Sequence, residues 1–351
     1  MNQNKLLIIL NWKLLLYRVY MFNELAKRGY DITIVTPTND GNNIPIPISF
    51  KILELPTIDL GPFVWVKGLK KIQPEEYDSI LLMPNFRYIN LMKFLLPKFR
   101  KKMVLWGHMK GRTSGNRVVH YIRKSLFKHY SLLFYDYGTM KDYLSYGYDS
   151  KKLFVANNTQ YVDNSKVDLN AAKDSFLFVG RIQERKRIDL ALRAFGIFKK
   201  QLLKSEVRFV VIGGGDIDYL KRIVDQEQIE DVVFAGAVYD EGELANYFTS
   251  AIAYVSPGPV GLGVLHAFAF GVPVITCPSH HHGPEINNCD EHNSIIVEDT
   301  PEAIADAMYT LYTDEKLRKE MSVYAYDYYN KYCTLDLMID NMDKAIKSVM
   351  V

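Results

Sequence analysis

Residues 256–274, SPGPVGLGVLHAFAFGVPV, combine a glycine loop with the start of a helix. Gly261 and Gly263 follow a turn-forming head, and the apolar run after them fits a helix that ends before Gly271. The first turn of a helix presents unpaired N–H groups and a partial positive charge, and glycine lets the backbone approach an anion closely. The loop could therefore hold the diphosphate of a nucleotide-activated donor. The alternative is an ordinary glycine turn, which joins strand to helix in many α/β proteins.

A second set of polar residues follows two strands predicted in the first half of the chain. His108 comes directly after the strand predicted at residues 103–106, where open parallel sheets bind ligands. We predict that His108 is a catalytic residue that donates a hydrogen bond to a phosphate or sugar. The alternatives are a base and a structural histidine. Asn11 and Trp12 occupy the first strand–helix turn, which lacks the G-x-G-x-x-G pattern of a dinucleotide site. Arg18 lies early in the next helix and either faces a phosphate or is solvated.

Alternating strands and helices must position these groups. Apolar runs predict strands, and amphipathic segments between them predict helices, which is typical of two doubly wound parallel sheets. A polar stretch ending near Ser165 indicates a linker. We predict a first domain at 1–163, a second at 164–334, and a last helix at 335–351 that packs back on the first domain.

Composition indicates a globular protein in a reducing compartment. The 351 residues are 48% hydrophobic and 13% aromatic, and three cysteines are too few for a disulfide framework. No apolar run approaches the length of a membrane span, and no signal peptide is predicted. We expect a cytoplasmic protein, soluble or peripheral on the inner face of a membrane.

Charge is distributed unevenly along the chain. Residues 1–163 hold 24 Lys and Arg against 12 Asp and Glu, whereas the remainder holds 19 against 28. The basic half indicates an anionic partner, such as a phosphorylated acceptor or an anionic lipid surface. Residues 88–102 form a basic amphipathic stretch that suits a membrane surface, or alternatively a core-packed helix with a solvated basic end. Phe63 and Trp65 lie in a proline-rich stretch that contacts an acceptor or simply packs. No nucleic-acid recognition motif is present.

The second half resembles the retaining glycosyltransferases of family 4, which have the GT-B fold. Phe178-Val179-Gly180-Arg181, followed by Lys186, matches the family's F-V-G-R strand end and its lysine. The resemblance makes Arg181 and Lys186 the catalytic pair that stabilises the departing diphosphate, whose negative charge grows as the glycosidic bond breaks. It implies two Rossmann-like domains that face a central cleft.

Further donor-binding residues follow from the same resemblance. The glycines after Ile212 match the turn that lines the family's donor cleft. Residue 238 lies where the family's backbone commonly contacts the base of the nucleotide. The family's signature has two glutamates, which here are replaced by Gly258 and His266. His266 is then expected to contact the ribose, and Glu285 could compensate for a missing carboxylate. The expected donor-binding residues are Gly180, Gly214, Gly215, Val238, Gly258, Val260, Gly261, Leu262, His266 and Glu285.

These residues and the resemblance together predict a retaining glycosyltransferase that uses a UDP- or GDP-linked sugar. The resemblance implies acceptor binding by the first domain through Asn11, Trp12, Arg18 and His108. The acceptor is expected to be lipid-linked or a saccharide, in surface polysaccharide or lipopolysaccharide assembly. No cofactor and no metal are expected, because His280-His281-His282 are consecutive and the cysteines lack zinc spacing. The rivals are a nucleotide-sugar epimerase of similar architecture and a non-catalytic nucleotide-sugar-binding or scaffold protein.

Overall fold

The computed structural model divides into two compact units. It describes residues 3–41, 44–109, 117–165, 167–202, 205–278 and 282–350. The first unit contains Met1–Tyr161 together with Leu335–Val351, and the second contains Val162–Thr334. The chain therefore passes between units two residues before the predicted linker boundary, and its last helix belongs to the first unit.

The first unit is built on a seven-stranded parallel sheet with the strand order β3-β2-β1-β6-β7-β8-β9. Its strands are β1 (Asn4–Ile9), β2 (Tyr30–Pro37), β3 (Lys51–Leu55), β6 (Ser79–Leu82), β7 (Met103–Trp106), β8 (Ser131–Phe134) and β9 (Leu153–Val155). Its α-helices are α1 (Leu16–Lys27), α2 (Arg117–Phe127), α3 (Tyr137–Ser145) and α10 (Leu335–Lys347). The strands β4 (Thr57–Leu60) and β5 (Phe63–Val66) form a separate antiparallel hairpin.

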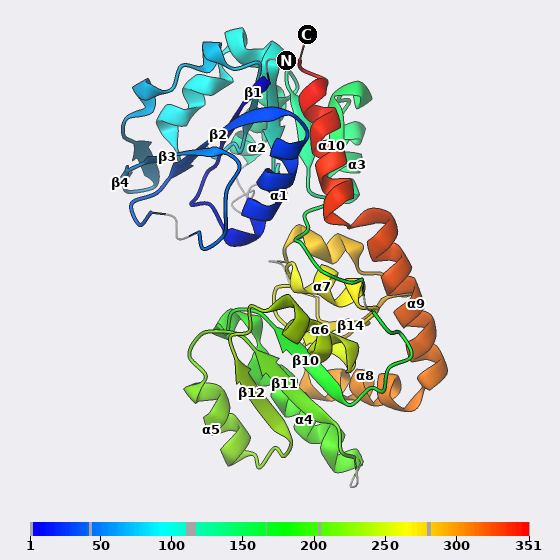
Figure 1. Ribbon diagram of the computed structural model, residues 1–351. Helices are drawn as coiled ribbons and strands as arrows, with labels where there is room; N and C mark the ends of the chain where they lie inside the picture. The colour runs from blue at the N-terminus through cyan, green and yellow to red at the C-terminus, as the bar shows by residue number, and fades with distance from the viewer. Residues whose placement is uncertain are drawn as a thin grey trace. The chain divides into compact units, whose positions relative to one another are not determined.

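Both faces of the first sheet are buried, because successive side chains of a strand point to opposite faces. Leu6 and Ile8 of β1 pack in one core, and Leu7 and Ile9 pack in the other. Helices α1 and α10 cover the first of these faces and lie side by side in Figure 1.

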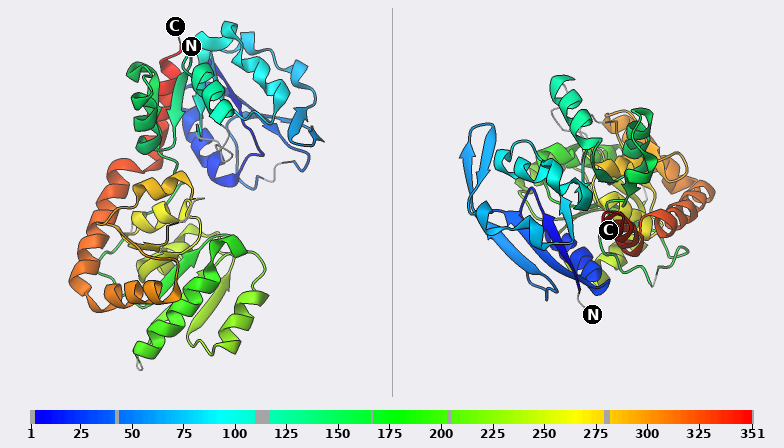
Figure 2. Two further views of the ribbon diagram at one scale, coloured as in Figure 1. Left: turned by 180° about the vertical axis from the view of Figure 1, so that it is seen from behind. Right: turned by 90° about the horizontal axis from the view of Figure 1, so that it is seen from above.

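The second unit repeats the design with a six-stranded parallel sheet in the order β12-β11-β10-β13-β14-β15. Its strands are β10 (Ser175–Val179), β11 (Arg208–Ile212), β12 (Val232–Gly236), β13 (Ala251–Ser256), β14 (Val274–Thr276) and β15 (Ser294–Ile296). Its α-helices are α4 (Ile188–Gln201), α5 (Asp218–Gln226), α6 (Glu241–Thr249), α7 (Gly263–Ala269), α8 (Pro301–Thr313) and α9 (Glu315–Tyr332). Helices α4 and α8 pack side by side on one face, as seen from behind in Figure 2.

The predicted fold class, two doubly wound parallel sheets, is confirmed. Residues 88–102 do pack against the core, but the single helix given as one alternative is wrong. This stretch forms two 3₁₀ helices, η3 (Ile89–Leu95) and η4 (Pro97–Lys102), and Pro97 separates them. Their apolar residues Leu91, Phe94 and Phe99 are buried in the core, so they are not available to a membrane surface. Within the described residues no helix is long and apolar enough to cross a membrane.

Candidate active site

A cavity of about 640 Å³ lies at the carboxyl edge of the second sheet. Parallel α/β sheets bind ligands at this edge, where the loops after neighbouring strands meet. The walls come from the loops that follow β10, β11 and β12. They consist of Val179, Gly180, Arg181, Ile182, Gln183, Ile212, Gly213, Gly214, Gly215, Ala237, Val238 and Tyr239.

Two of these loops are joined through their backbones. Gly180 donates its N–H to the Ile212 carbonyl at 2.9 Å, and Ile182 donates to the Gly214 carbonyl at 2.9 Å. This close approach requires glycine at Gly213, where φ is +157° and an added Cβ would lie 1.8 Å from the Gly180 carbonyl oxygen. Gly215 is equally constrained, with its hypothetical Cβ 2.3 Å from the Ile182 oxygen. The triple glycine therefore fixes the shape of the cavity floor.

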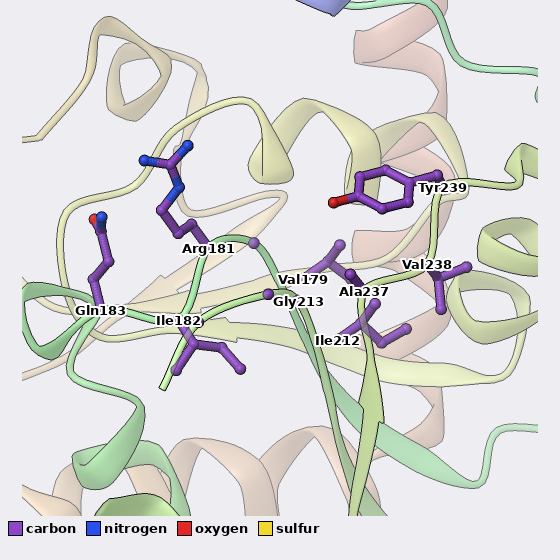
Figure 3. Close-up of a pocket in the computed structure, with 12 residues that line it drawn as sticks. Val179, Arg181, Ile182, Gln183, Ile212, Gly213, Ala237, Val238 and Tyr239 are labelled. Carbon is purple, nitrogen blue, oxygen red and sulfur yellow. The ribbon is translucent and has the colours of Figure 1, made fainter. Parts of the chain in front are cut away.

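Three polar side chains rise from these loops. Figure 3 shows Arg181 and Gln183 projecting to the same side of the loop after β10, whereas the buried Ile182 projects to the other side. The Tyr239 ring stands across the cavity, and 84% of this residue is exposed. Within the described residues no ion pair holds the exposed Arg181 guanidinium. Arg181 is therefore available to an anionic ligand.

Lys186 lies outside the cavity lining, at the glycine loop that precedes α7. Its ammonium donates a hydrogen bond to the Pro259 carbonyl. Burial, and next the charge of Arg185, lower the pKa of Lys186 to about 8, while Glu285 acts in the opposite direction. Lys186 is therefore a half-buried cation that an additional anion would stabilise.

Glu285 is buried close to the start of a short 3₁₀ helix. Only 4% of this residue is exposed, at the start of η7 (Pro284–Asn288). It opposes the lowering of the Lys186 pKa. Its negative charge therefore favours the protonated Lys186. That Glu285 compensates for a missing carboxylate stays a prediction.

Gly258 is closed to any side chain. Its N–H donates to the Lys186 carbonyl at 3.2 Å, and an added Cβ would lie 2.4 Å from the Arg185 carbonyl oxygen. The glutamate that the family resemblance places here has no room, because the backbone of residues 185–186 fills the space. Only the backbone of Gly258 can contribute to a ligand.

The loop before α7 is tied to the end of β14 by His282. Val260 donates its N–H to His282 Nδ1 at 3.2 Å, and His282 Nε2 lies 2.9 Å from the Cys277 carbonyl, which assigns the proton to Nε2. The expectation that the Val260 amide holds the donor is therefore wrong, since that donor is already used. Gly261 and Leu262 follow Val260 and lead into α7, which begins at Gly263. A Cβ added at Gly261 would meet nothing within 4 Å, so the backbone at Gly261 is open. His280 and His281 lie outside the described residues.

His266 does not reach the cavity, which corrects the expected ribose contact. The residue is 3% exposed, and its ring stacks on Phe248 at 4.3 Å between centroids and on Phe270 at 5.7 Å. Burial lowers the pKa of His266 to about 4, so the ring is neutral near pH 7. Its Nε2 lies 3.9 Å from a carboxylate oxygen of Glu241. Where the family has a glutamate, this chain has His266, which belongs to the core between α6 and α7.

The sequence-predicted residues of the first unit gather at the carboxyl edge of its own sheet. Asn11 and Trp12 follow β1, and 61% of Trp12 is exposed. His108 is exposed and packs edge-on against the Tyr135 ring, with the centroids 5.0 Å apart. Arg18 also reaches Tyr135, through a hydrogen bond of 2.9 Å to its hydroxyl.

Sequence reasoning missed Gln183 and Tyr239. Gln183 lies two residues after Arg181 in an extended stretch, so the period of two could have placed both on one side. Tyr239 directly follows Val238, which was predicted and does line the cavity. Gly180, Arg181, Gly214 and Gly215, all predicted, also line it.

Comparison with known proteins finds a family match over the second unit. Residues 162–328 match the model of the family described as Glycosyl transferases group 1. The match spans most of the second unit, which is therefore similar to glycosyltransferase group 1 domains. A D-inositol 3-phosphate glycosyltransferase of Paenarthrobacter aurescens is 32% identical to this chain over 157 residues, covering 42% of this chain and 38% of the relative. The chain thus matches less than half of that relative's length.

Solved structures extend the likeness in fold to both units. A glycosyltransferase from Rickettsia africae matches with a TM-score of 0.73 and 14% identity, covering 99% of each chain. Anabaena HepE, solved in complex with UDP-glucose, matches with a TM-score of 0.68 and 13% identity, covering 98% of this chain and 99% of HepE. The fold is therefore the GT-B fold of two parallel-sheet α/β domains.

Proposed function

We propose that this protein is a retaining glycosyltransferase that transfers a sugar from a UDP- or GDP-linked donor. The observation that carries the proposal is the cavity at the carboxyl edge of the second sheet. On its wall lies the Arg181 guanidinium, which no ion pair holds among the residues that the structure describes. The family match over this unit supports it, and so does the UDP-glucose complex of the structural neighbour HepE.

Transfer of the sugar requires positive charge beside the diphosphate leaving group. As the bond between sugar and diphosphate breaks, the diphosphate gains negative charge, which a guanidinium and backbone amides stabilise best when they are already in place. Arg181 would contact the diphosphate directly, and Lys186 would add charge from the neighbouring loop. Val238 and Tyr239 would receive the base, with the Tyr239 ring as a stacking surface. That no metal or further cofactor is required stays a prediction.

The acceptor belongs to the first unit in this proposal. It would be lipid-linked or a saccharide in surface polysaccharide or lipopolysaccharide assembly, contacted by Asn11, Trp12, Arg18 and His108. The excess of basic residues in this half supports an anionic acceptor or surface.

A panel of UDP-, GDP-, ADP- and CMP-sugars tests the proposal. We expect one class to raise the melting temperature and to release free nucleotide when a glycan extract is added. Stabilisation without turnover would favour a binding or scaffold protein. Conversion of the free nucleotide sugar into an isomer would favour an epimerase.

The pKa of Lys186 predicts how donor binding depends on pH. A diphosphate binds the protonated lysine, so the dissociation constant for UDP should stay constant below about pH 8. Above that pH the free protein loses the proton, and the dissociation constant should rise by up to tenfold per pH unit. Titration calorimetry from pH 6.5 to 9 would check this.

Two variants sharpen the measurement. Lys186→Met should bind UDP more weakly and remove the bend in the profile. Glu285→Gln should move the bend to lower pH, because the counter-charge is lost. An identical profile in all three proteins would contradict the role given to Lys186.

We also propose that the β4–β5 hairpin contacts an anionic membrane surface. Ile58, Leu60, Phe63 and Trp65 share its outer face in register and are 40–49% exposed. Val64 on the other face is buried. Four adjoining apolar side chains on a basic unit are typical of a surface that enters the headgroup region of an anionic bilayer.

Vesicle sedimentation tests the hairpin. The protein should bind vesicles that contain phosphatidylglycerol more tightly than vesicles of phosphatidylcholine alone. The double change Phe63→Ser and Trp65→Ser should weaken binding about tenfold or more, since each ring contributes roughly 1.5–3 kcal/mol when buried. The matched control is Tyr309→Ser with Val323→Ser, two exposed apolar residues of the second unit. Equal binding by both double variants would refute the proposal.

A further inference from the structure

Arg18 occupies the point where four strands of the first sheet end. It lies in the first turn of α1, which follows β1. Its side chain contacts Met83, which follows β6, Trp106 at the end of β7, and Tyr135, which follows β8. In the strand order, β1 is flanked by β2 on one side and by β6 on the other, so the chain's crossovers diverge between β1 and β6. Open α/β sheets bind ligands beside such a point.

Among the described residues, the groups that hold the Arg18 guanidinium are formally neutral. Nε donates to the Tyr17 hydroxyl at 3.1 Å, and Nη2 donates to the Tyr135 hydroxyl at 2.9 Å. Nη1 lies 2.9 Å from the Met83 sulfur, a weak acceptor, and Cζ lies 4.8 Å from the centre of the Trp106 ring. These contacts fix the plane of the guanidinium without neutralising its charge.

No carboxylate compensates for this partly buried cation. Within the described residues Arg18 forms no ion pair, and none of the residues outside those ranges is Asp or Glu. Removing a charge from water is costly unless an opposite charge is present. A guanidinium has five N–H donors, of which three are used here, so two remain for a ligand. The site is thus one negative charge short.

We propose that Arg18 binds an oxyanion of the acceptor, a phosphate ester or a carboxylate, at the carboxyl edge of the first sheet. The exposed His108 ring packs against the same Tyr135 ring, at the same edge of the sheet. The binding of an oxyanion follows from the first unit alone. Only its assignment to an acceptor rests on the proposed function.

Anion titration of the full chain tests the site. Inorganic phosphate would also occupy the donor cavity, so the titration is made in the Arg181→Met background. Calorimetry should detect one phosphate there, and adding Arg18→Met should weaken its binding at least tenfold. Arg18→Lys should retain part of the affinity. Glucose 6-phosphate and glucuronate, titrated in parallel, distinguish the phosphate ester from the carboxylate by which of them Arg18→Met weakens more.

The controls separate this site from the donor site and from folding. Arg28→Met removes an exposed arginine from the other end of α1, where it pairs with Asp340 at 2.5 Å, and should leave phosphate binding unchanged. Arg18→Met alone should leave the UDP affinity unchanged. If it unfolds the unit, Arg18→Lys and Tyr135→Phe, each of which should weaken phosphate binding, carry the test. Phosphate binding that is indifferent to every change at Arg18 would overturn the inference. If UDP does not bind while phosphate binding still depends on Arg18, only the proposed function is contradicted.

Discussion

Replacing Arg181 with methionine is expected to lower kcat/KM for sugar transfer by about 10²–10³-fold. Arg181 lines the cavity, is exposed, and has no ion-pair partner among the residues that the structure describes, so its charge is free for the diphosphate. The interaction strengthens as the leaving group gains charge, and the loss should therefore appear mainly in kcat. Steady-state kinetics with the donor identified in the nucleotide-sugar panel would measure it.

Arg208→Met is the matched control for this change. Arg208 begins β11 and thus lies at the opposite end of the same sheet, where it pairs with Asp174. Its replacement should leave the kinetics unchanged, because an exposed ion pair contributes little. Equal activity of the Arg181→Met enzyme and the wild type would exclude Arg181 from the reaction.

Gly213→Ala is expected to destabilise the second unit by about 3–5 kcal/mol, from backbone strain at a positive φ together with overpacking. The added methyl group would lie 1.8 Å from the Gly180 carbonyl oxygen, so the two loops under the cavity must separate. The melting temperature should fall by roughly 10 °C, and UDP binding should be lost even where the protein remains folded.

Gly214→Ala tests whether the effect comes from this contact. The neighbouring Gly214 has no positive φ, and its added Cβ would lie 3.8 Å from the Ala237 methyl, which is ordinary contact. This variant should keep nearly the same melting temperature and the same UDP affinity. Comparable losses for the two alanine variants would show that the loop geometry described here is wrong.

Much of the architecture could be predicted, because buried parallel strands have a strong local signature. The strand predicted at residues 103–106 is observed with the same bounds as β7. The short strands β3 and β15 were missed, since runs of three to five residues with mixed polarity resemble loops. The 3₁₀ helices η3 and η4 were misjudged because Pro97 and the packing of Leu91 and Phe94 against the sheet outweigh the helical period.

Part of the candidate site could also be predicted from the sequence, and part could not. Arg181 and the glycines after Ile212 could be recognised because short motifs at strand ends keep a fixed relation to the sheet. His266, Val260 and Gly258 depend on contacts distant in sequence, with Phe248, His282 and Arg185 respectively. Residue type at these positions does not reveal whether a side chain or amide is already occupied. The neutral surroundings of Arg18 were hidden for the same reason.

A crystal structure of the protein soaked with UDP tests the central claim most directly. We predict that the diphosphate lies in the cavity at the end of β10, with its oxygens about 3 Å from the Arg181 guanidinium and its base next to Tyr239. Nucleotide bound elsewhere, with Arg181 turned away from the anion, would contradict it.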